Sequence, residues 1–217
     1  MTAGKEDYLK ALFGLGEKYD MVTNKELADE LNVTAPSVSE MIAKLQKNGY
    51  IDYTAYKGSR LTAEGRREAL KIMRFHRLWE VFLTNCLGYS WSEAHEEAHR
   101  LEHHTSVKMA QRLDEYLHHP ACCPHGSIIP REDGSFSIPK VKVRQLSTLK
   151  EGETTHIRKV TEEKELMDYL QELGIEIGLQ VTLLKAEKYE GHFLLATPHG
   201  NITLSYKAAC KIFVDPE

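Results

Sequence analysis

The sequence predicts a mostly helical chain that ends in a small β domain. Three observations favour this fold class. Residues 1–71 hold two short helical runs with a tight turn between them and then a hairpin pattern, residues 72–139 hold longer amphipathic runs, and residues 140–217 hold short β-type runs with glycine turns. We therefore expect a winged helix-turn-helix domain, a helical domain and a small β-barrel, in that order.

The first domain is expected to open with a helix over residues 5–19. The pattern Thr23-x-x-Glu26 is a capping box that begins a short second helix. Thr34 then caps a third helix, with Pro36 in its first turn, where a missing N–H costs nothing. The apolar residues expected on the inward face of this third helix are Val38, Met41, Ile42 and Leu45.

Two short helices joined by a tight turn, the second with small and polar outward residues, are typical of a DNA-binding helix-turn-helix. Runs at 50–53 and 60–62 bracket a turn and predict a two-stranded wing. Residues 1–71 carry 11 Lys+Arg and 11 Asp+Glu, so affinity for phosphates must come from a local basic surface. The candidate DNA-contacting residues are Thr34, Ala35, Pro36, Ser37, Ser39, Glu40, Lys44, Lys47, Lys57 and Arg60.

The middle domain is expected to contain three helices. Thr62 caps a long helix through about residue 86, and Gly88 breaks it before a histidine-rich helix that starts at Ser90 or Ser92. A third helix covers about 106–117. Together these helices present more apolar surface than a domain of this size buries alone, which predicts a homodimer.

Histidines are concentrated in this middle domain, which holds eight of the eleven in the chain. Helical spacing brings one group of side chains onto a single face: His95, His99, Glu102 and His103. His76 and Glu80 form a second pair at i and i+4. Imidazole and carboxylate groups clustered in this way are the ligands that divalent first-row cations require, and they predict a metal-sensing regulator.

A rigid loop with two prolines follows at 118–126, and a linker rich in proline, glycine and charge is expected over 128–143. Beyond the linker, one helix is expected at 163–173. The expected strands are 155–160, 181–186, 193–196, 201–204 and 211–214.

The composition excludes several classes of protein. No run of about 18 apolar residues exists, and no charged-then-apolar leader opens the chain, so neither membrane insertion nor export is expected. The net charge of −4 argues against indiscriminate nucleic-acid coating. The four cysteines lack C-x-x-C spacing, which favours a reduced, cytoplasmic setting. No organic cofactor is expected.

Five ordered motifs carry a family resemblance: K-E-D-Y-L at 5–9, A-P-S-V-S-E-M-I at 35–42, H-R-L-W-E-V-F-L at 76–83, H-E-E-A-H-R-L-E-H at 95–103 and C-P-H-G at 123–126. With them the chain resembles the diphtheria-toxin-repressor family from end to end, closest to its long manganese-dependent branch. The resemblance implies a Mn²⁺-activated repressor of metal-uptake genes that binds double-stranded operator DNA as a homodimer. It also implies that the C-terminal barrel is SH3-like, of the FeoA type.

The resemblance further implies two metal sites. The first would use Asp7, His99, Glu102 and His103. The second would use His76, Glu80, Cys123 and His125, with Glu162 from the barrel. His95 also matches a ligand position of the family, but the resemblance does not assign it to one of the two sites. The hard carboxylate of Asp7 favours Mn²⁺, whereas His99 stands where manganese-type relatives usually have glutamate, so Fe²⁺ and Zn²⁺ stay open.

Two alternatives remain from the sequence. His95-Glu96-x-x-His99 matches the zinc hydrolase signature. However, Glu102 and His103 follow too closely to be the usual third ligand, and the helix-turn-helix would go unexplained. A winged-helix regulator that responds to an organic ligand, or to oxidation of Cys122 and Cys123, is the other. We expect a protein that is not an enzyme.

Overall fold

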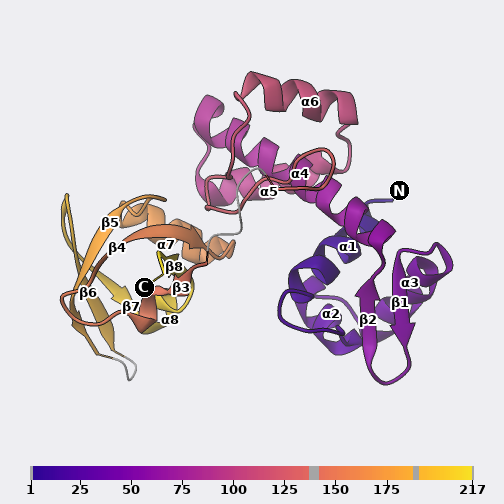
Figure 1. The fold of residues 1–217 in the computed structure, drawn as a ribbon, viewed down its shortest axis with the longest axis horizontal. Helices are drawn as coiled ribbons and strands as arrows, with labels where there is room; N and C mark the ends of the chain where they lie inside the picture. Colours follow the sequence, from indigo (N-terminus) through magenta and orange to yellow (C-terminus); the bar gives the residue numbers. More distant parts are fainter. Residues whose placement is uncertain (1, 137–141, 188–190, 217) are drawn as a thin grey trace. The chain divides into compact units, whose positions relative to one another are not determined.

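A computed structural model describes residues 2–136, 142–187 and 191–216. The helices and strands are labelled in Figure 1, and the chain divides into two compact units. The first contains Met1–His76, Arg100–Ala110 and Pro130–Ser135, and the second contains Arg77–His99, Gln111–Ile129 and Phe136–Glu217. Within the described ranges, no helix is both long enough and apolar enough to cross a membrane.

The first unit begins with helices α1 (Ala3–Leu15), α2 (Asn24–Leu31) and α3 (Ala35–Lys47). The predicted capping box at α2 is confirmed, because the Thr23 side chain accepts from the backbone N–H of Glu26 and the Glu26 carboxylate accepts from that of Thr23. The turn between α2 and α3 places Asn32 at φ 50°, a left-handed conformation that asparagine tolerates.

One apolar core holds these helices together. α1 contributes Leu9 and Leu12, α2 contributes Leu27, and α3 contributes Val38 and Leu45, all of them buried. The predicted inward face of α3 is thus confirmed, with Met41 packed at the margin of the core. Each fully buried side chain of this kind stabilises the fold by about 1.5–3 kcal/mol.

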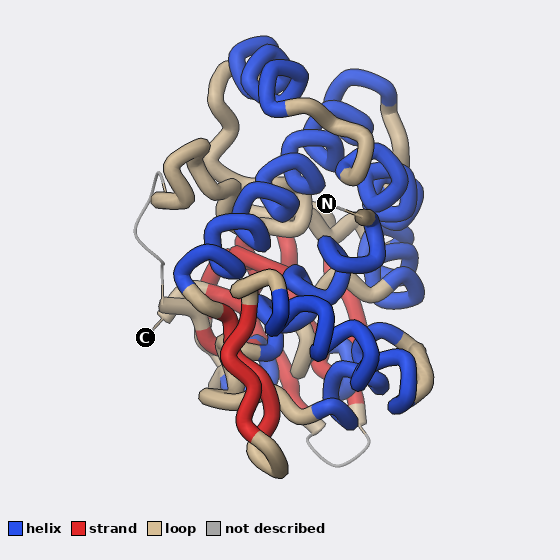
Figure 2. The backbone as a smooth tube through the Cα atoms, turned by 90° about the vertical axis from the view of Figure 1, so that its right-hand side faces the viewer, coloured by secondary structure: helices blue, strands red, loops and turns tan. Residues whose placement is uncertain are grey.

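The wing is a two-stranded hairpin of β1 (Ile51–Thr54) and β2 (Gly58–Leu61), seen as the paired strands ending in a turn in Figure 2. The strands extend further toward the tip than predicted. The reason is a backbone bridge between Val22 and Ser59, which fixes the start of β2. Gly58 is required there, because a Cβ atom on it would lie 2.3 Å from the carbonyl oxygen of Val22.

Three helices follow the wing: α4 (Ala63–Leu87), α5 (Trp91–Glu102) and α6 (Val107–Tyr116). Their predicted starts are confirmed, because the hydroxyls of Thr62, Ser90 and Ser106 each accept a backbone N–H at the beginning of one helix.

The end of the second unit is a six-stranded antiparallel sheet with the order β3-β8-β4-β5-β6-β7. Its elements are β3 (Arg144–Gln145), the 3₁₀ turn η1 (Leu146–Thr148), β4 (Thr154–Val160), α7 (Lys164–Glu172), β5 (Gln180–Ala186), β6 (His192–Thr197), β7 (Gly200–Ser205), α8 (Tyr206–Ala209) and β8 (Ile212–Val214). The core of this part includes Ile157, Met167 and Phe193, and Trp91 at the start of α5 joins it.

The predicted fold class is confirmed, and each expected strand is found within about two residues. The sequence analysis missed β3 and α8, which are too short for a periodic pattern. Part of the predicted linker, 137–141, lies outside the described residues. Arg131–Ser135 forms a turn closed by a hydrogen bond from the backbone N–H of Arg131 to the carbonyl of Ser135.

Candidate metal centre

The first unit brings together acidic and imidazole side chains from α1 and the C-terminal end of α5. Ligand atoms of Asp7, Glu102 and His103 all lie within 4.8 Å of one another. The Nε2 atom of His103 is 3.1 Å from Oδ1 of Asp7 and 3.5 Å from Oε1 of Glu102. Two carboxylates and an imidazole at this spacing form a donor set that fits a divalent first-row cation.

His99, the fourth predicted ligand of this site, is exposed on α5 three residues before Glu102. Residues at i and i+3 lie on the same side of a helix, so His99 and Glu102 share one face of α5. Its role as a ligand stays a prediction.

Glu6 was missed by the sequence analysis. Its buried carboxylate lies 2.6 Å from the Nδ1 atom of His103. Because an ionised carboxylate only accepts hydrogen bonds, Nδ1 is the donor in this contact, and the ring is held with Nε2 facing Asp7 and Glu102. The adjacent acids Glu6 and Asp7 were the only signal in the sequence, and only the second was chosen.

Glu102 itself is enclosed by cationic and imidazole groups. The Nζ atom of Lys10 lies 2.6 Å and 2.8 Å from its two carboxylate oxygens, and Nδ1 of His76 lies 2.7 Å from Oε2. The sequence analysis did not select Lys10 and placed His76 in the second site. In the structure, His76 therefore contacts a predicted first-site residue, whereas its role in the second site stays a prediction.

The second unit contains another cluster, in which ligand atoms of Glu80, Cys123, His125 and Glu162 lie within 4.8 Å of one another. Glu80 and His125 are fully buried, with Oε1 of Glu80 3.3 Å from Nδ1 of His125. Sγ of Cys123 is 3.7 Å from the same nitrogen. Nδ1 of His95 lies 2.8 Å from Oε1 of Glu80 and thus at the edge of the cluster.

A short loop positions the thiol and imidazole of this cluster. The backbone N–H of Cys123 donates to Ser127, and that of Gly126 donates to Cys123. Gly126 has φ 82°, and a Cβ atom on it would lie 1.9 Å from the carbonyl oxygen of Arg158. Hence only glycine fits where the loop approaches β4. The Ser127 hydroxyl donates to Glu162 at 3.0 Å, which orients that carboxylate.

The burial and the charges of the second cluster raise the pKa of the Cys123 thiol. Burial raises the pKa of Cys123 well above its ordinary value, and the carboxylates of Glu80 and Glu162 raise it further, while Arg77 acts in the opposite direction. Without a cation the thiol therefore stays protonated at neutral pH. A buried donor set of thiol, imidazole and carboxylates fits a divalent cation, whose charge would offset the two acids and favour the thiolate.

The residues predicted to contact DNA are exposed on α3, on its cap and on the wing. The Thr34 hydroxyl accepts from the backbone of Ser37, as expected for a cap. Glu40 pairs with Lys44 at 2.6 Å, and Arg60 pairs with Asp52 across the hairpin at 3.3 Å.

Comparison with known proteins identifies the family. Residues 1–59 match the model of the iron-dependent repressor N-terminal DNA-binding domain, residues 62–131 match the iron-dependent repressor metal-binding and dimerisation domain, and residues 144–216 match the FeoA domain. A solved manganese-dependent transcriptional repressor in complex with manganese is 35% identical, with a TM-score of 0.86, over 96% of this chain and 98% of that chain. The chain belongs to the iron-dependent repressor family.

Other members of the family align over nearly the whole chain. The iron-dependent repressor IdeR of Mycobacterium leprae is 28% identical over 222 residues, which is 97% of this chain and 96% of that protein. The structure of ScaR with bound Cd²⁺ is 35% identical, with a TM-score of 0.81, over 98% of this chain and 99% of that chain. The diphtheria toxin repressor of Corynebacterium efficiens is 29% identical over 84% of this chain and 83% of its own length.

As a member of the iron-dependent repressor family, the chain is a metal-dependent transcriptional repressor and not an enzyme. The predicted family and the predicted role as a metal-dependent transcriptional repressor are therefore confirmed. The hydrolase alternative gives way, and Glu96, which would be its general base, is exposed and pairs with Lys164 at 2.5 Å. Membership of a metal-dependent repressor family also argues against a regulator that responds to an organic ligand or to thiol oxidation.

Proposed function

We propose that this repressor is activated by Mn²⁺ and then binds operator DNA of metal-uptake genes as a homodimer. The observation that carries the proposal is the convergence of Asp7, from α1, with Glu102 and His103, from the end of α5. A cation held by these side chains would join the first helix of the DNA-binding domain to a segment of the metal-binding domain. We propose domain limits of 1–71, 72–139 and 140–217.

The proposed coupling runs through α1. Leu9, Leu12 and Phe13 bury α1 in the core that also holds α2 and α3, while Asp7 on the same helix faces Glu102 and His103. When bound, the cation supplies the positive charge that draws these acids together. Asp7 then fixes α1, and α1 fixes the position of α3. A coupling of about 1–3 kcal/mol would change DNA affinity by a factor of 5–150.

The choice of Mn²⁺ rests on the donors. Asp7 and Glu102 offer hard carboxylate oxygens, and His103 offers one nitrogen. His99, one turn before Glu102, would complete the set with a second nitrogen. Because a nitrogen ligand at this position suits Fe²⁺ and Zn²⁺ as well as Mn²⁺, these two ions stay as candidates. A manganese complex of one relative and a Zn²⁺ complex of another, ScaR, are known.

We propose that the second cluster is a supporting metal site. Glu80, Cys123, His125 and Glu162 are its ligands, with His95 and His76 as additional candidates. The cluster draws on α4, the 118–126 loop and the segment before α7, so a cation there would tie the C-terminal barrel to the rest of the second unit.

For DNA, we propose that α3 enters the major groove and that Lys44, Lys47, Lys57 and Arg60 contact phosphates. The remaining proposed contacts are Thr34, Ala35, Pro36, Ser37, Ser39 and Glu40. A homodimer would present two such helices to two half-sites.

The test is binding of a duplex, selected from random DNA in the presence of Mn²⁺, while Mn²⁺, Fe²⁺ and Zn²⁺ are titrated separately. We expect each active metal to tighten binding and EDTA to reverse it, with Mn²⁺ effective at the lowest free concentration. Asp7→Ala and Glu102→Ala should abolish the response without unfolding the protein, whereas Asp20→Ala, an exposed acid beyond α1, should not. A full Mn²⁺ response in either ligand variant would contradict the proposal.

A further inference from the structure

Lys10 lies on α1, one turn beyond Asp7, and reaches into the first cluster. Its Nζ atom contacts both carboxylate oxygens of Glu102, at 2.6 Å and 2.8 Å. The Glu102 side chain is fully buried, whereas that of Lys10 keeps 21% of its surface exposed. The ammonium group of a partly exposed side chain thus contacts both oxygens of a buried carboxylate.

A buried carboxylate requires compensation by opposite charge or hydrogen bonds. Lys10 supplies a full positive charge, and His76 adds a contact at 2.7 Å to one oxygen. Glu102 is also a proposed metal ligand. The two oxygens that a metal ion would use are therefore also the oxygens that Lys10 contacts.

We propose that Lys10 sets the affinity of the metal site, because it is a resident cation that competes with the divalent ion for Glu102. This inference rests on the proposed function, since it takes Glu102 as a ligand. For Glu102 to bind an ion, at least one of its oxygens must exchange Lys10 for that ion. Lys10 therefore raises the metal concentration at which the repressor responds.

Two physical effects act in the same direction. Lys10 occupies the oxygens that the ion needs, and its positive charge repels a divalent cation at short range. The partly exposed stem of Lys10 allows the ammonium group to move into water once it is displaced, so the cost of displacement is limited. The competition consequently shifts the response threshold without preventing the response.

The contact also links α1 to the end of α5. Asp7 and Lys10 are at i and i+3 on α1, so both face the end of α5 that carries Glu102. The ion pair of Lys10 with Glu102 and a metal link through Asp7 would join the same two helices. Ion and lysine are alternative partners of one carboxylate.

The test measures Mn²⁺ binding directly, by calorimetry and by the electron paramagnetic resonance signal of free Mn²⁺, on the full chain. We expect Lys10→Met to bind Mn²⁺ roughly tenfold more tightly than wild type, since one partly buried ion pair no longer competes. The metal-free variant should also melt at a lower temperature. Lys10→Gln, which keeps a hydrogen-bond donor without the charge, should shift affinity in the same direction.

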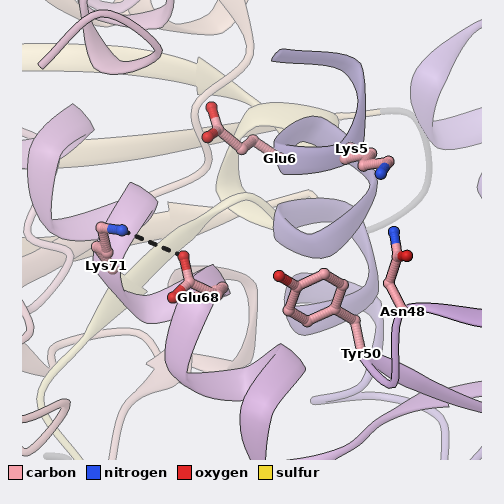
Figure 3. Close-up of a pocket in the computed structure, with 6 residues that line it drawn as sticks. All are labelled: Lys5, Glu6, Asn48, Tyr50, Glu68 and Lys71. Atoms are coloured by element: carbon pink, nitrogen blue, oxygen red, sulfur yellow. Dashed lines mark hydrogen bonds and ion pairs between the residues drawn. The ribbon is translucent and has the colours of Figure 1, made fainter. Parts of the chain in front are cut away.

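Lys5→Met is the matched control, because it removes one positive charge from the same helix. Lys5 lines a cavity of about 440 Å³ beside Glu6, and its side chain points away from that of Glu6 (Figure 3). Lys5→Met should leave Mn²⁺ affinity within about twofold of wild type, since the Lys5 side chain is directed away from Glu6, which contacts His103. Lys10→Arg, which retains the charge, should also bind Mn²⁺ no more tightly than wild type.

Equal or weaker Mn²⁺ binding by both Lys10→Met and Lys10→Gln would overturn the inference, because Lys10 would then position Glu102 for the ion rather than compete with it. Glu102→Gln, run in parallel, separates this outcome from failure of the proposed function. If the wild type binds Mn²⁺ and Glu102→Gln binds it equally well, then Glu102 is not a ligand and the proposed site itself is wrong.

Discussion

The Nδ1 atom of His103 lies 2.6 Å from the Oε2 atom of Glu6, and both side chains are at most 10% exposed. This contact orients the imidazole so that Nε2 faces the other proposed ligands. Glu6→Gln replaces the strong acceptor with an amide and should weaken Mn²⁺ binding by about 10–100-fold, the usual cost of losing a carboxylate behind a histidine ligand. Calorimetric titration with Mn²⁺ measures the change.

Glu68→Gln is the control for Glu6→Gln. Glu68 lines the same cavity as Glu6 and pairs with Lys71 at 3.2 Å (Figure 3). The Glu68→Gln variant removes the same charge as Glu6→Gln from a residue outside the contact with His103, so it should leave Mn²⁺ affinity unchanged. Equal losses in the two variants would mean that charge alone, and not the orientation of His103, controls the site.

Cys122 and Cys123 provide a neighbouring pair for testing the second cluster. Only Cys123 belongs to the group of Glu80, His125 and Glu162. After dialysis, Cys123→Ser should retain about one fewer Zn²⁺ per chain than wild type, because a thiolate ligand is lost. Cys122→Ser should retain the wild-type amount, and metal analysis by mass spectrometry distinguishes the two. Equal retention in both variants would remove Cys123 from the ligand set.

The raised pKa of Cys123 predicts how stability depends on pH in the metal-free protein. The folded state keeps the thiol proton that the unfolded chain releases above about pH 8.5, so the unfolded state binds fewer protons there. Stability is therefore complete at neutral pH and falls above pH 8.5, by at most about 1.4 kcal/mol per pH unit.

Urea unfolding in EDTA at pH 7 and pH 10 measures this fall. Cys123→Ser should reduce it, whereas Cys86→Ser, which changes an exposed thiol, should not. A fall of the same size in Cys123→Ser and wild type would assign the alkaline instability to other groups.

The two lysines at the end of α3 should contribute unequally to DNA affinity. Lys44 already pairs with Glu40, while Lys47 is exposed in the last turn of the helix. Lys47→Gln should reduce the slope of log affinity against log salt by about one, as expected for one lost phosphate contact. Lys44→Gln should reduce it less, because Glu40 partly neutralises that charge. Filter binding over a salt series gives both slopes, and Lys108→Gln on α6 serves as the control.

Much of the fold was predictable because its signals are local. Thr23 and Glu26 form a capping box within four residues, and Val38, Ile42 and Leu45 have the period of a buried helix face. Such patterns depend on the chain immediately around them. The short strand β3 and helix α8 lack enough residues for a period, and they form only because the sheet and its core enclose them.

The site was predictable only in part, for a related reason. Glu102 and His103 lie in a histidine-rich helical pattern whose chemistry marks ligands, whereas Asp7 was implied as a ligand by the family resemblance. Glu6 and Lys10 look like ordinary charged residues of a helix, and their roles arise from contacts with residues more than 90 positions away. Likewise, nothing in the i and i+4 spacing of His76 and Glu80 indicates that His76 contacts Glu102.

The backbone bridge between Val22 and Ser59 joins the turn end of the wing to the loop that precedes α2. This end of the hairpin is therefore tied to the helix pair, and it has no room for an added side chain at Gly58. Variation in charge at the turn itself, residues 55–57, would leave this attachment unchanged. Divergence toward a new binding sequence is therefore open to the turn and closed to Gly58 beside it.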